Sequence, residues 1–260
     1  FFIFILLPPA MAIGWRNIFP LAIGHLSQSR LWRDVATTGI IYLLGIFVLF
    51  NVSKAMGGNQ NSTDYNRLVK LYFAQMPIPI DPGTRPFWGT PNAPVTIIEF
   101  SDFQCPYCRV AAANLKPSLA EYKKEVVFYF ANYPLDSSCN PNITRPMHTV
   151  ACTAAKAVLC AEREGKFWSY HDKVFENQKK LSKEMLLQIA ESLEMNKEAF
   201  VQCLESEEIN AKVKQDIELG TKLDVHGTPS IFINGRSFPA WRDREALRTI
   251  VDEELKRARK

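Results

Sequence analysis

The feature that most constrains the fold of this chain is a pair of cysteines placed between a predicted strand and a predicted helix. Residues 95–100 form an apolar run, Val-Thr-Ile-Ile-Glu-Phe, which is typical of a buried strand. After a short turn comes Cys105-Pro-Tyr-Cys108, and apolar residues then recur at helical spacing from Val110 to Leu119. This order predicts an α/β fold in which the first cysteine stands at the N-terminus of a helix.

The position of the cysteine pair predicts redox chemistry. The N-terminal amides and the macrodipole of a helix stabilise a thiolate, so we expect Cys105 to be exposed and to act as the nucleophile. Cys108 lies one helical turn further on, where we expect it to be more buried and to attack a mixed disulfide. Pro106 suits the first turn of a helix because it has no N–H to lose. The alternatives are an inert structural disulfide and half of a zinc site, although the sequence has no second C-x-x-C for a zinc ribbon.

The residues around the cysteines resemble the active-site segment of the DsbA-like thiol–disulfide oxidoreductases, a branch of the thioredoxin superfamily. The resemblance rests on residues 100–108, Phe-Ser-Asp-Phe-Gln-Cys-Pro-Tyr-Cys, and on Gly227-Thr-Pro-Ser230, which is similar to the cis-proline loop of that family. It implies a thioredoxin-like fold with an inserted helical domain at about residues 145–223. It also implies that Pro229 is cis and packs beside the two cysteines. The residues implied to tune the redox potential are Pro106, Tyr107 and Thr228.

One acidic residue and three histidines remain to be interpreted. Glu99 stands six residues before Cys105, near the position where the superfamily commonly has a buried acid that aids proton transfer. The resemblance therefore implies a proton-transfer role for Glu99, and the alternative is an ordinary strand carboxylate. His148, His171 and His226 are interpreted as helix-surface or loop residues, of which His226 adjoins the proline loop.

The other four cysteines predict two structural disulfides. All six cysteines follow residue 104, and their even number fits an oxidising compartment. Once the two cysteines of the motif pair, the remaining four allow three connectivities, of which we favour Cys139–Cys152 and Cys160–Cys203. Cys152 and Cys160 are expected on one helix, roughly 12 Å apart along its axis, so they cannot bridge directly. Buried free thiols are the alternative.

The first part of the chain predicts membrane segments. Residues 35–53 carry no charge, and about 18 helical residues cover roughly 28 Å, close to the thickness of a hydrocarbon core. Residues 1–15 are also uncharged and are interpreted as the end of an earlier membrane helix in a longer chain. Three arginines lie in residues 16–34, so the positive-inside rule places that loop in the cytoplasm and the later residues outside. These features predict a protein of the bacterial inner membrane with its catalytic domain on the periplasmic or extracytoplasmic side.

The chain is predicted to comprise three regions. Residues 1–53 are the membrane region, residues 54–93 a linker and an extended arm with a short helix, and residues 94–260 the DsbA-like domain. The polar, glycine-bearing stretch 57–63 is expected to form the linker, and the first helix of the insertion is expected at residues 145–161. The expected order in the last region is strand, helix, strand, helical insertion, hairpin and final helix.

Taken together, these patterns predict a membrane-anchored protein disulfide oxidoreductase that introduces disulfides into exported proteins with thiols. Cys105 would exchange its disulfide with a substrate thiol, and Cys108 would resolve the intermediate, without a metal or an organic cofactor in this domain. The alternatives are a disulfide reductase or isomerase of the same fold, and a non-catalytic tethered binding module or copper chaperone. A nucleic-acid partner is not expected, because 31 basic and 27 acidic side chains give a net charge of only +4.

The order of a membrane span and a DsbA-like domain also resembles bacterial fusions of a vitamin K epoxide reductase-like membrane domain with a thioredoxin-like partner. This resemblance implies contact with membrane lipid and a membrane redox partner in the same chain, with quinone as the oxidant. The sequence departs from that pattern because residues 1–104 contain no cysteine. The catalytic part of such a membrane domain would therefore lie upstream of Phe1.

Overall fold

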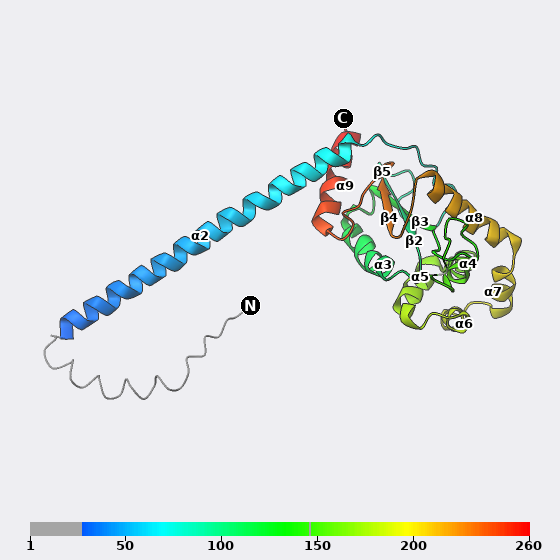
Figure 1. The fold of residues 1–260 in the computed structure, drawn as a ribbon, viewed down its shortest axis with the longest axis horizontal. Coiled ribbons are helices and arrows are strands. Elements are labelled where there is room, and N and C mark those ends of the chain that lie inside the picture. The colour runs from blue at the N-terminus through cyan, green and yellow to red at the C-terminus, as the bar shows by residue number, and fades with distance from the viewer. Residues whose placement is uncertain (1–27, 146) are drawn as a thin grey trace, which may run out of the picture. The chain divides into compact units, whose positions relative to one another are not determined.

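The computed structural model describes residues 28–145 and 147–260. It divides into two compact units, Phe1–Thr63 and Asp64–Lys260. The second unit is an α/β domain built on one sheet (Figure 1). Its strands are β1 (Phe87–Gly89), β2 (Val95–Ser101), β3 (Val126–Asn132), β4 (Ser230–Ile233) and β5 (Arg236–Ser237). Its helices are the end of α2 (Gln28–Ala74), α3 (Pro106–Ser118), α4 (Ala151–Glu162), α5 (Phe167–Glu176), α6 (Lys183–Ser192), α7 (Lys197–Leu204), α8 (Glu207–Lys222) and α9 (Arg244–Ala258).

The sheet has the strand order β1-β3-β2-β4-β5. Strands β2 and β3 are parallel and joined by α3, whereas every other neighbouring pair is antiparallel. The predicted order of strand, helix, strand, insertion, hairpin and helix is therefore confirmed. Strand β1 lies within the region predicted as an extended arm, and its three residues are too few to give a period-two pattern. Its pairing with β3 defines it as a strand.

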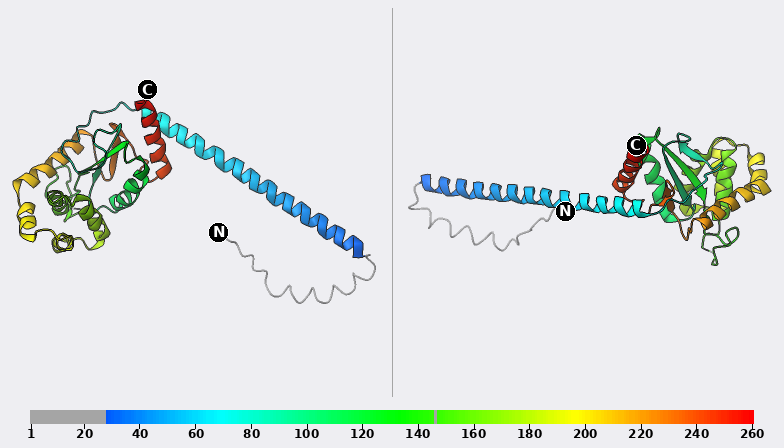
Figure 2. Two further views of the ribbon diagram at one scale, coloured as in Figure 1. Left: turned by 180° about the vertical axis from the view of Figure 1, so that it is seen from behind. Right: turned by 90° about the horizontal axis from the view of Figure 1, so that it is seen from above.

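Helices cover both faces of the sheet, which explains why the central strand β2 is apolar along most of its length (Figures 1 and 2). Side chains alternate between the faces. Ile98 and Phe100 belong to a core shared with helices α4 to α8 of the insertion. Val95 and Ile97 belong to a second core with α3 and α9. The cysteine motif follows β2 directly, so both cores fix its position.

Two disulfides hold the helical insertion. Cys139–Cys152 ties the loop after β3 to α4, and Cys160–Cys203 ties α4 to α7. These are the two pairs favoured from the sequence.

The start of α4 differs from the prediction. The helix begins at Ala151, whereas the sequence predicted a helix from residue 145. His148 donates its backbone N–H to the carbonyl oxygen of Leu135, 3.3 Å away, so it is held by the loop after β3 and not by a helical turn.

Helix α2 also differs from the prediction. It runs without interruption from Gln28 to Ala74. The prediction of a linker at residues 57–63 is therefore wrong, because these residues continue the helix. Glycines in a helix cost about 1 kcal/mol each but do not prevent it, and no proline occurs between Gln28 and Met76. Among the residues that the structure describes, none of the helices combines the length and the apolar character needed to cross a membrane. The predicted membrane segment at residues 1–15 lies outside the described residues, as do several side chains of the predicted span at 35–53.

The arm before β1 is anchored by a buried ion pair. Arg85 Nε lies 2.7 Å from Asp216 Oδ1, and both side chains are almost fully covered. The other carboxylate oxygen of Asp216 accepts hydrogen bonds from the backbone N–H of Asn132 (2.8 Å) and from its side-chain amide (3.0 Å). One carboxylate on α8 therefore joins the arm to the end of β3.

Candidate active site

Cys105 occupies the N-cap position of α3, and Pro106 follows in the first turn. Its Sγ lies 3.3 Å from the carbonyl oxygen of Thr228. The Sγ of Cys108 accepts a hydrogen bond from the backbone N–H of Asp102 at 3.4 Å. Cys105 is 5% exposed and Cys108 is fully buried. The predicted order of accessibility holds, but Cys105 is less exposed than predicted because the Thr228 segment lies against its sulfur.

The two thiols have opposite acidities, although they lie one turn apart. The pKa of Cys105 falls from 9.0 to about 5, first because the Cys108 thiol donates a hydrogen bond to its thiolate. Backbone N–H groups of the first turn of α3 act in the same direction, while burial acts against them. Burial raises the pKa of Cys108 well above its ordinary value, and the neighbouring Cys105 and the charge of Glu99 raise it further. At neutral pH the reduced pair therefore holds one thiolate, on Cys105, and one thiol.

The Thr228–Pro229 peptide bond is cis, as the resemblance implied, and the carbonyl oxygen of Thr228 lies beside Cys105. The hydroxyl of Thr228 is buried and has no hydrogen-bond partner among the described residues. Strand β4 begins directly afterwards at Ser230 and pairs with Phe100 at the end of β2. The register of these two strands therefore places the proline loop opposite the cysteine motif.

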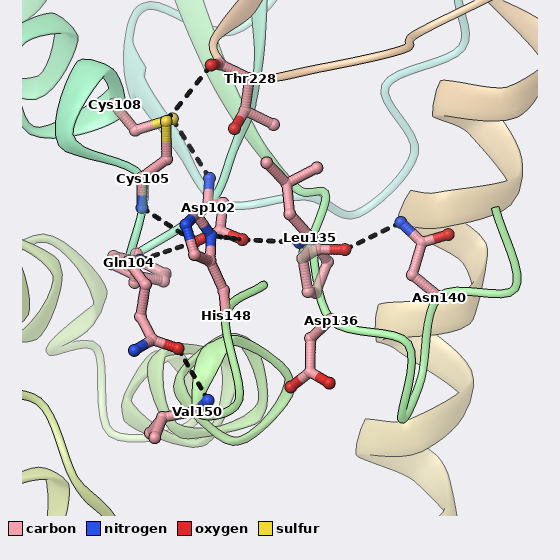
Figure 3. A network of polar contacts seen from close by, with 12 residues as sticks. Asp102, Gln104, Cys105, Cys108, Leu135, Asp136, Asn140, His148, Val150 and Thr228 are labelled. Carbon is pink, nitrogen blue, oxygen red and sulfur yellow. Dashed lines mark hydrogen bonds and ion pairs between the residues drawn. The ribbon is translucent and has the colours of Figure 1, made fainter. Parts of the chain in front are cut away.

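Asp102 is the centre of a polar network beneath the cysteines (Figure 3). Its side chain is buried, and its Oδ1 accepts hydrogen bonds from the backbone N–H groups of Gln104 (2.6 Å) and Cys105 (3.1 Å). Its Oδ2 accepts a hydrogen bond from the backbone N–H of Leu135 (2.6 Å) and lies 3.0 Å from Nδ1 of His148. From the sequence alone, Asp102 is only a part of the motif. An aspartate just before a helix, able to bond the backbone two residues on, was the signal available in the sequence.

Two of the three histidines make contacts that the sequence did not indicate. His148 faces Asp102 with a side chain that is 21% exposed, and this contact raises its pKa above the ordinary value while burial opposes the rise. His171 is buried, and burial lowers its pKa. The interpretation of His171 as a surface residue was therefore wrong, because helical spacing cannot reveal which distant segment covers a residue, whereas His148 does lie in a loop, as interpreted. His226 is exposed in its loop, as interpreted, and pairs with Asp224 at 2.9 Å.

Two glutamines fasten the active-site loop to the insertion. Gln178 lies in a short 3-10 turn after α5, and its side-chain amide donates hydrogen bonds to the carbonyl oxygens of Phe103 and Cys105, both at 2.9 Å. Gln104 accepts a hydrogen bond from the backbone N–H of Val150 at 2.7 Å. Sequence patterns gave no signal for either contact, because each joins segments far apart in the chain.

Glu99 is buried in β2, and one of its carboxylate oxygens has no hydrogen-bond partner among the described residues. Its pKa rises from 4.5 to about 7, first because burial disfavours the carboxylate and also because Cys105 carries a negative charge. The charges of Lys116 and the hydroxyl of Ser101 oppose this rise. The carboxyl is thus electrostatically linked to both thiols.

Within the described part of the chain, no group of three or more His, Cys, Asp or Glu side chains is arranged to hold a metal ion.

Comparison with known proteins gives a consistent picture. The sequence model of the family described as Thioredoxin matches residues 81–253. The probable disulfide bond formation protein D of Bacillus anthracis is 32% identical over 179 residues, which cover 65% of this chain and 77% of that protein. The Na(+)/H(+) antiporter NhaA 3 of Salinispora tropica is 32% identical over 174 residues, which cover 67% of this chain but only 25% of that protein. This chain therefore spans about a quarter of the length of that relative.

Solved structures extend the comparison. Oxidised BdbD from Bacillus subtilis matches with a TM-score of 0.56 and 27% identity, over 66% of this chain and 93% of that one. The thiol-disulfide exchange protein alpha-DsbA2 from Wolbachia pipientis matches with a TM-score of 0.58 and 21% identity, over 75% of this chain and 97% of that one. At 21% identity, the likeness to alpha-DsbA2 concerns the fold alone.

Proposed function

Because the chain belongs to the thioredoxin family, as a DsbA-like thiol–disulfide oxidoreductase, we propose that it introduces disulfides into exported proteins through Cys105 and Cys108. The observation that carries this proposal is the position of Cys105 at the N-cap of α3 and beside the Thr228 carbonyl, where hydrogen bonds lower its pKa to about 5. A thiol that is stable as a thiolate is a good leaving group, and a stable reduced form makes the disulfide a strong oxidant.

The proposed reaction starts from the Cys105–Cys108 disulfide. A substrate thiolate attacks Sγ of Cys105, which forms a mixed disulfide and releases Cys108 as a thiolate that takes up a proton. A second thiolate of the substrate then attacks the substrate sulfur of the mixed disulfide and releases Cys105 as a thiolate. The substrate loses two electrons and gains a disulfide, and the cysteine pair gains the two electrons. Return of Cys108 to the mixed disulfide is the competing reverse step.

The other residues have supporting roles in this proposal. The cis Pro229 and Thr228 would lie against the substrate segment, because the carbonyl oxygen of Thr228 lies against the sulfur of Cys105. Pro106 and Tyr107 separate the two cysteines and are both exposed, so they would set the potential without contributing to the core.

Membrane anchoring is part of the proposal. The large apolar side chains between Ile40 and Val52 are between 48% and 73% exposed, and the sequence there is free of charge. Relatives named as antiporters match over about a quarter of their length, which supports a thiol domain carried by a longer chain. A membrane redox partner that uses quinone, in the same or another chain, would reoxidise the pair. Recovery of the protein in the membrane fraction, with Cys105 modified only by reagents added from outside, would support this arrangement.

The test of the function is the reduction potential of the Cys105/Cys108 pair. The full chain, kept in detergent micelles, is equilibrated with glutathione buffers, and the reduced fraction is measured by alkylation and mass spectrometry. We expect a value near the oxidant end of the known range, about −120 mV, together with transfer of one disulfide to a reduced, unfolded protein. A value of about −270 mV would mark a reductase and contradict the proposal.

A further prediction concerns Glu99. We propose that its carboxyl donates the proton that the leaving Cys108 thiolate takes up. Replacing Glu99 with glutamine is expected to slow single-turnover disulfide transfer by about 10²-fold, because the amide keeps the shape but supplies no acidic proton. Rapid mixing of the oxidised chain with a model dithiol measures the rate.

The same variant has a separate effect on stability, which serves as its control. The folded state raises the pKa of Glu99, so it favours the protonated carboxyl. The stability that this carboxyl contributes to the reduced protein is fully present below pH 4.5 and is lost as the pH rises through about 7. Glu99→Gln is therefore expected to be the more stable form at about pH 8, by roughly 2–3 kcal/mol in urea unfolding. A changed stability with an unchanged transfer rate would make Glu99 an ordinary strand carboxylate.

A further inference from the structure

His148 is held in a fixed place next to the cysteine motif. Its backbone N–H donates to the carbonyl oxygen of Leu135 at 3.3 Å, and its Nδ1 lies 3.0 Å from Oδ2 of Asp102. The side chain is 21% exposed, so solvent protons can reach it while the carboxylate beneath it stays buried. Figure 3 shows the imidazole of His148 beside the side chain of Asp102, near Cys105.

Asp102 links this histidine to the nucleophile. The carboxylate oxygen that does not face His148 accepts a hydrogen bond from the backbone N–H of Cys105 at 3.1 Å. The contacts thus run from the imidazole through one buried carboxylate to the residue that begins α3.

The charges around Cys105 make a cation at this place significant. Asp102 places a carboxylate against the motif, and Glu99 adds a second negative charge near both thiols where it has lost its proton. Pro106 and Tyr107, between the cysteines, bring no basic side chain. These anions oppose a thiolate on Cys105.

Three acidic groups act on His148. Asp102 makes the hydrogen bond, and the charges of Cys105 and Asp136 act on the imidazole from the active-site loop and from the loop after β3. Together they raise the pKa of His148, while burial lowers it. The imidazolium is therefore favoured in the folded state, and the interaction with Cys105 must stabilise both partners equally.

We propose that His148 is a positioning residue of the thiol–disulfide reaction: clamped on Asp102, it supplies a pH-dependent positive charge that stabilises the Cys105 thiolate. This inference rests on the proposed function, because it concerns the oxidising strength of the same cysteine pair. The stabilisation is present where His148 is protonated and is lost as the pH rises through its raised pKa. The chain is thus a stronger oxidant in acid than in alkaline surroundings, beyond the ordinary proton dependence of a dithiol.

The test compares His148→Asn with the unchanged chain, both as the full chain in detergent. The thiolate of Cys105 is followed by its ultraviolet absorbance against pH, and the potential is measured against glutathione at about pH 6 and about pH 9. We expect the apparent pKa of Cys105 to rise by about one unit, and the equilibrium constant at about pH 6 to fall about tenfold, which corresponds to about 30 mV. At about pH 9 the two proteins should agree.

Two further variants separate charge from packing. His226→Asn removes another histidine that pairs with an aspartate, at 2.9 Å, but with a side chain 82% exposed, and it should change neither quantity. His148→Lys keeps a cation at all these pH values, so it should retain the low apparent pKa of Cys105 and extend the stronger oxidation to about pH 9. An equal effect of His148→Asn at both pH values, or no effect at either, would overturn the inference.

These outcomes are distinct from a failure of the proposed function. If the unchanged chain transfers no disulfide or has the potential of a reductase, the proposed function fails. If the unchanged chain is an oxidant and His148→Asn has the same pH profile, only the role of His148 fails.

Discussion

Replacing Cys105 with serine is expected to reduce the rate of disulfide transfer by about 10³-fold or more, because the hydroxyl oxygen can neither accept a substrate sulfur nor leave as a stable anion. Cys108→Ser should also stop turnover, but with a different signature. Its Cys105 thiolate can still form a mixed disulfide, and no neighbouring thiol can return to break it. Incubation of the reduced variants with oxidised glutathione, followed by mass spectrometry of the intact chain, distinguishes the two.

The asymmetry between the two serine variants is the informative part of this experiment. A glutathione adduct should accumulate on Cys108→Ser and be absent from Cys105→Ser, since the thiolate is assigned to Cys105. The matched control replaces Cys160 and Cys203 together with alanine, because that disulfide ties α4 to α7 and takes no part in exchange. Adducts of equal amount on both serine variants would contradict the assignment of the nucleophile.

Breaking the Arg85–Asp216 ion pair is expected to cause a large loss of stability. Arg85→Met should lower the free energy of unfolding by about 3–5 kcal/mol, because it leaves the carboxylate of Asp216 buried without its countercharge. Burial already raises the pKa of Asp216 although Arg85 opposes the rise. Without Arg85 the carboxyl binds a proton more readily, so the loss should be larger at about pH 7 than at about pH 5. Urea unfolding of the oxidised chain, followed by near-ultraviolet circular dichroism, measures both values.

The chain offers a matched control for this variant. Arg163 pairs with Glu208 at 2.6 Å, but the two side chains are 40% and 63% exposed. Arg163→Met should therefore change the stability by no more than about 0.5 kcal/mol. Similar losses of stability in the two variants would mean that burial of the Arg85–Asp216 pair adds nothing to the free energy of unfolding.

The thioredoxin-like α/β fold and the two cysteines of the site could be predicted from local patterns. The strand before Cys105, the helix after Cys108 and the hairpin near the end of the chain each occupy one continuous stretch of sequence. The resemblance of Gly227-Thr-Pro-Ser230 to a known loop also gave the cis bond at Pro229, which no local pattern predicts.

The contacts that complete the site could not be predicted in this way. Asp102 and His148 are 46 residues apart in sequence, and nothing in either segment specifies the other. Gln178 joins the insertion to Cys105 over 73 residues. Helix α2 continues through a glycine-bearing stretch that composition alone assigns to a linker. Composition describes local preference, and the structure depends on which distant segments meet.

The side-chain amide of Gln178 bears on whether the helical insertion can be removed from this protein. It bonds the carbonyl oxygens of Phe103 and Cys105, and the insertion that carries it also supplies His148 and the partner of Gln104. The helical insertion is therefore not a removable module placed on a self-sufficient redox core. An excised chain that joined β3 directly to β4 would keep both cysteines but lose the scaffold that orients them. Grafting the four-residue motif onto another thioredoxin-like protein would transfer the two cysteines without the surrounding contacts that orient them.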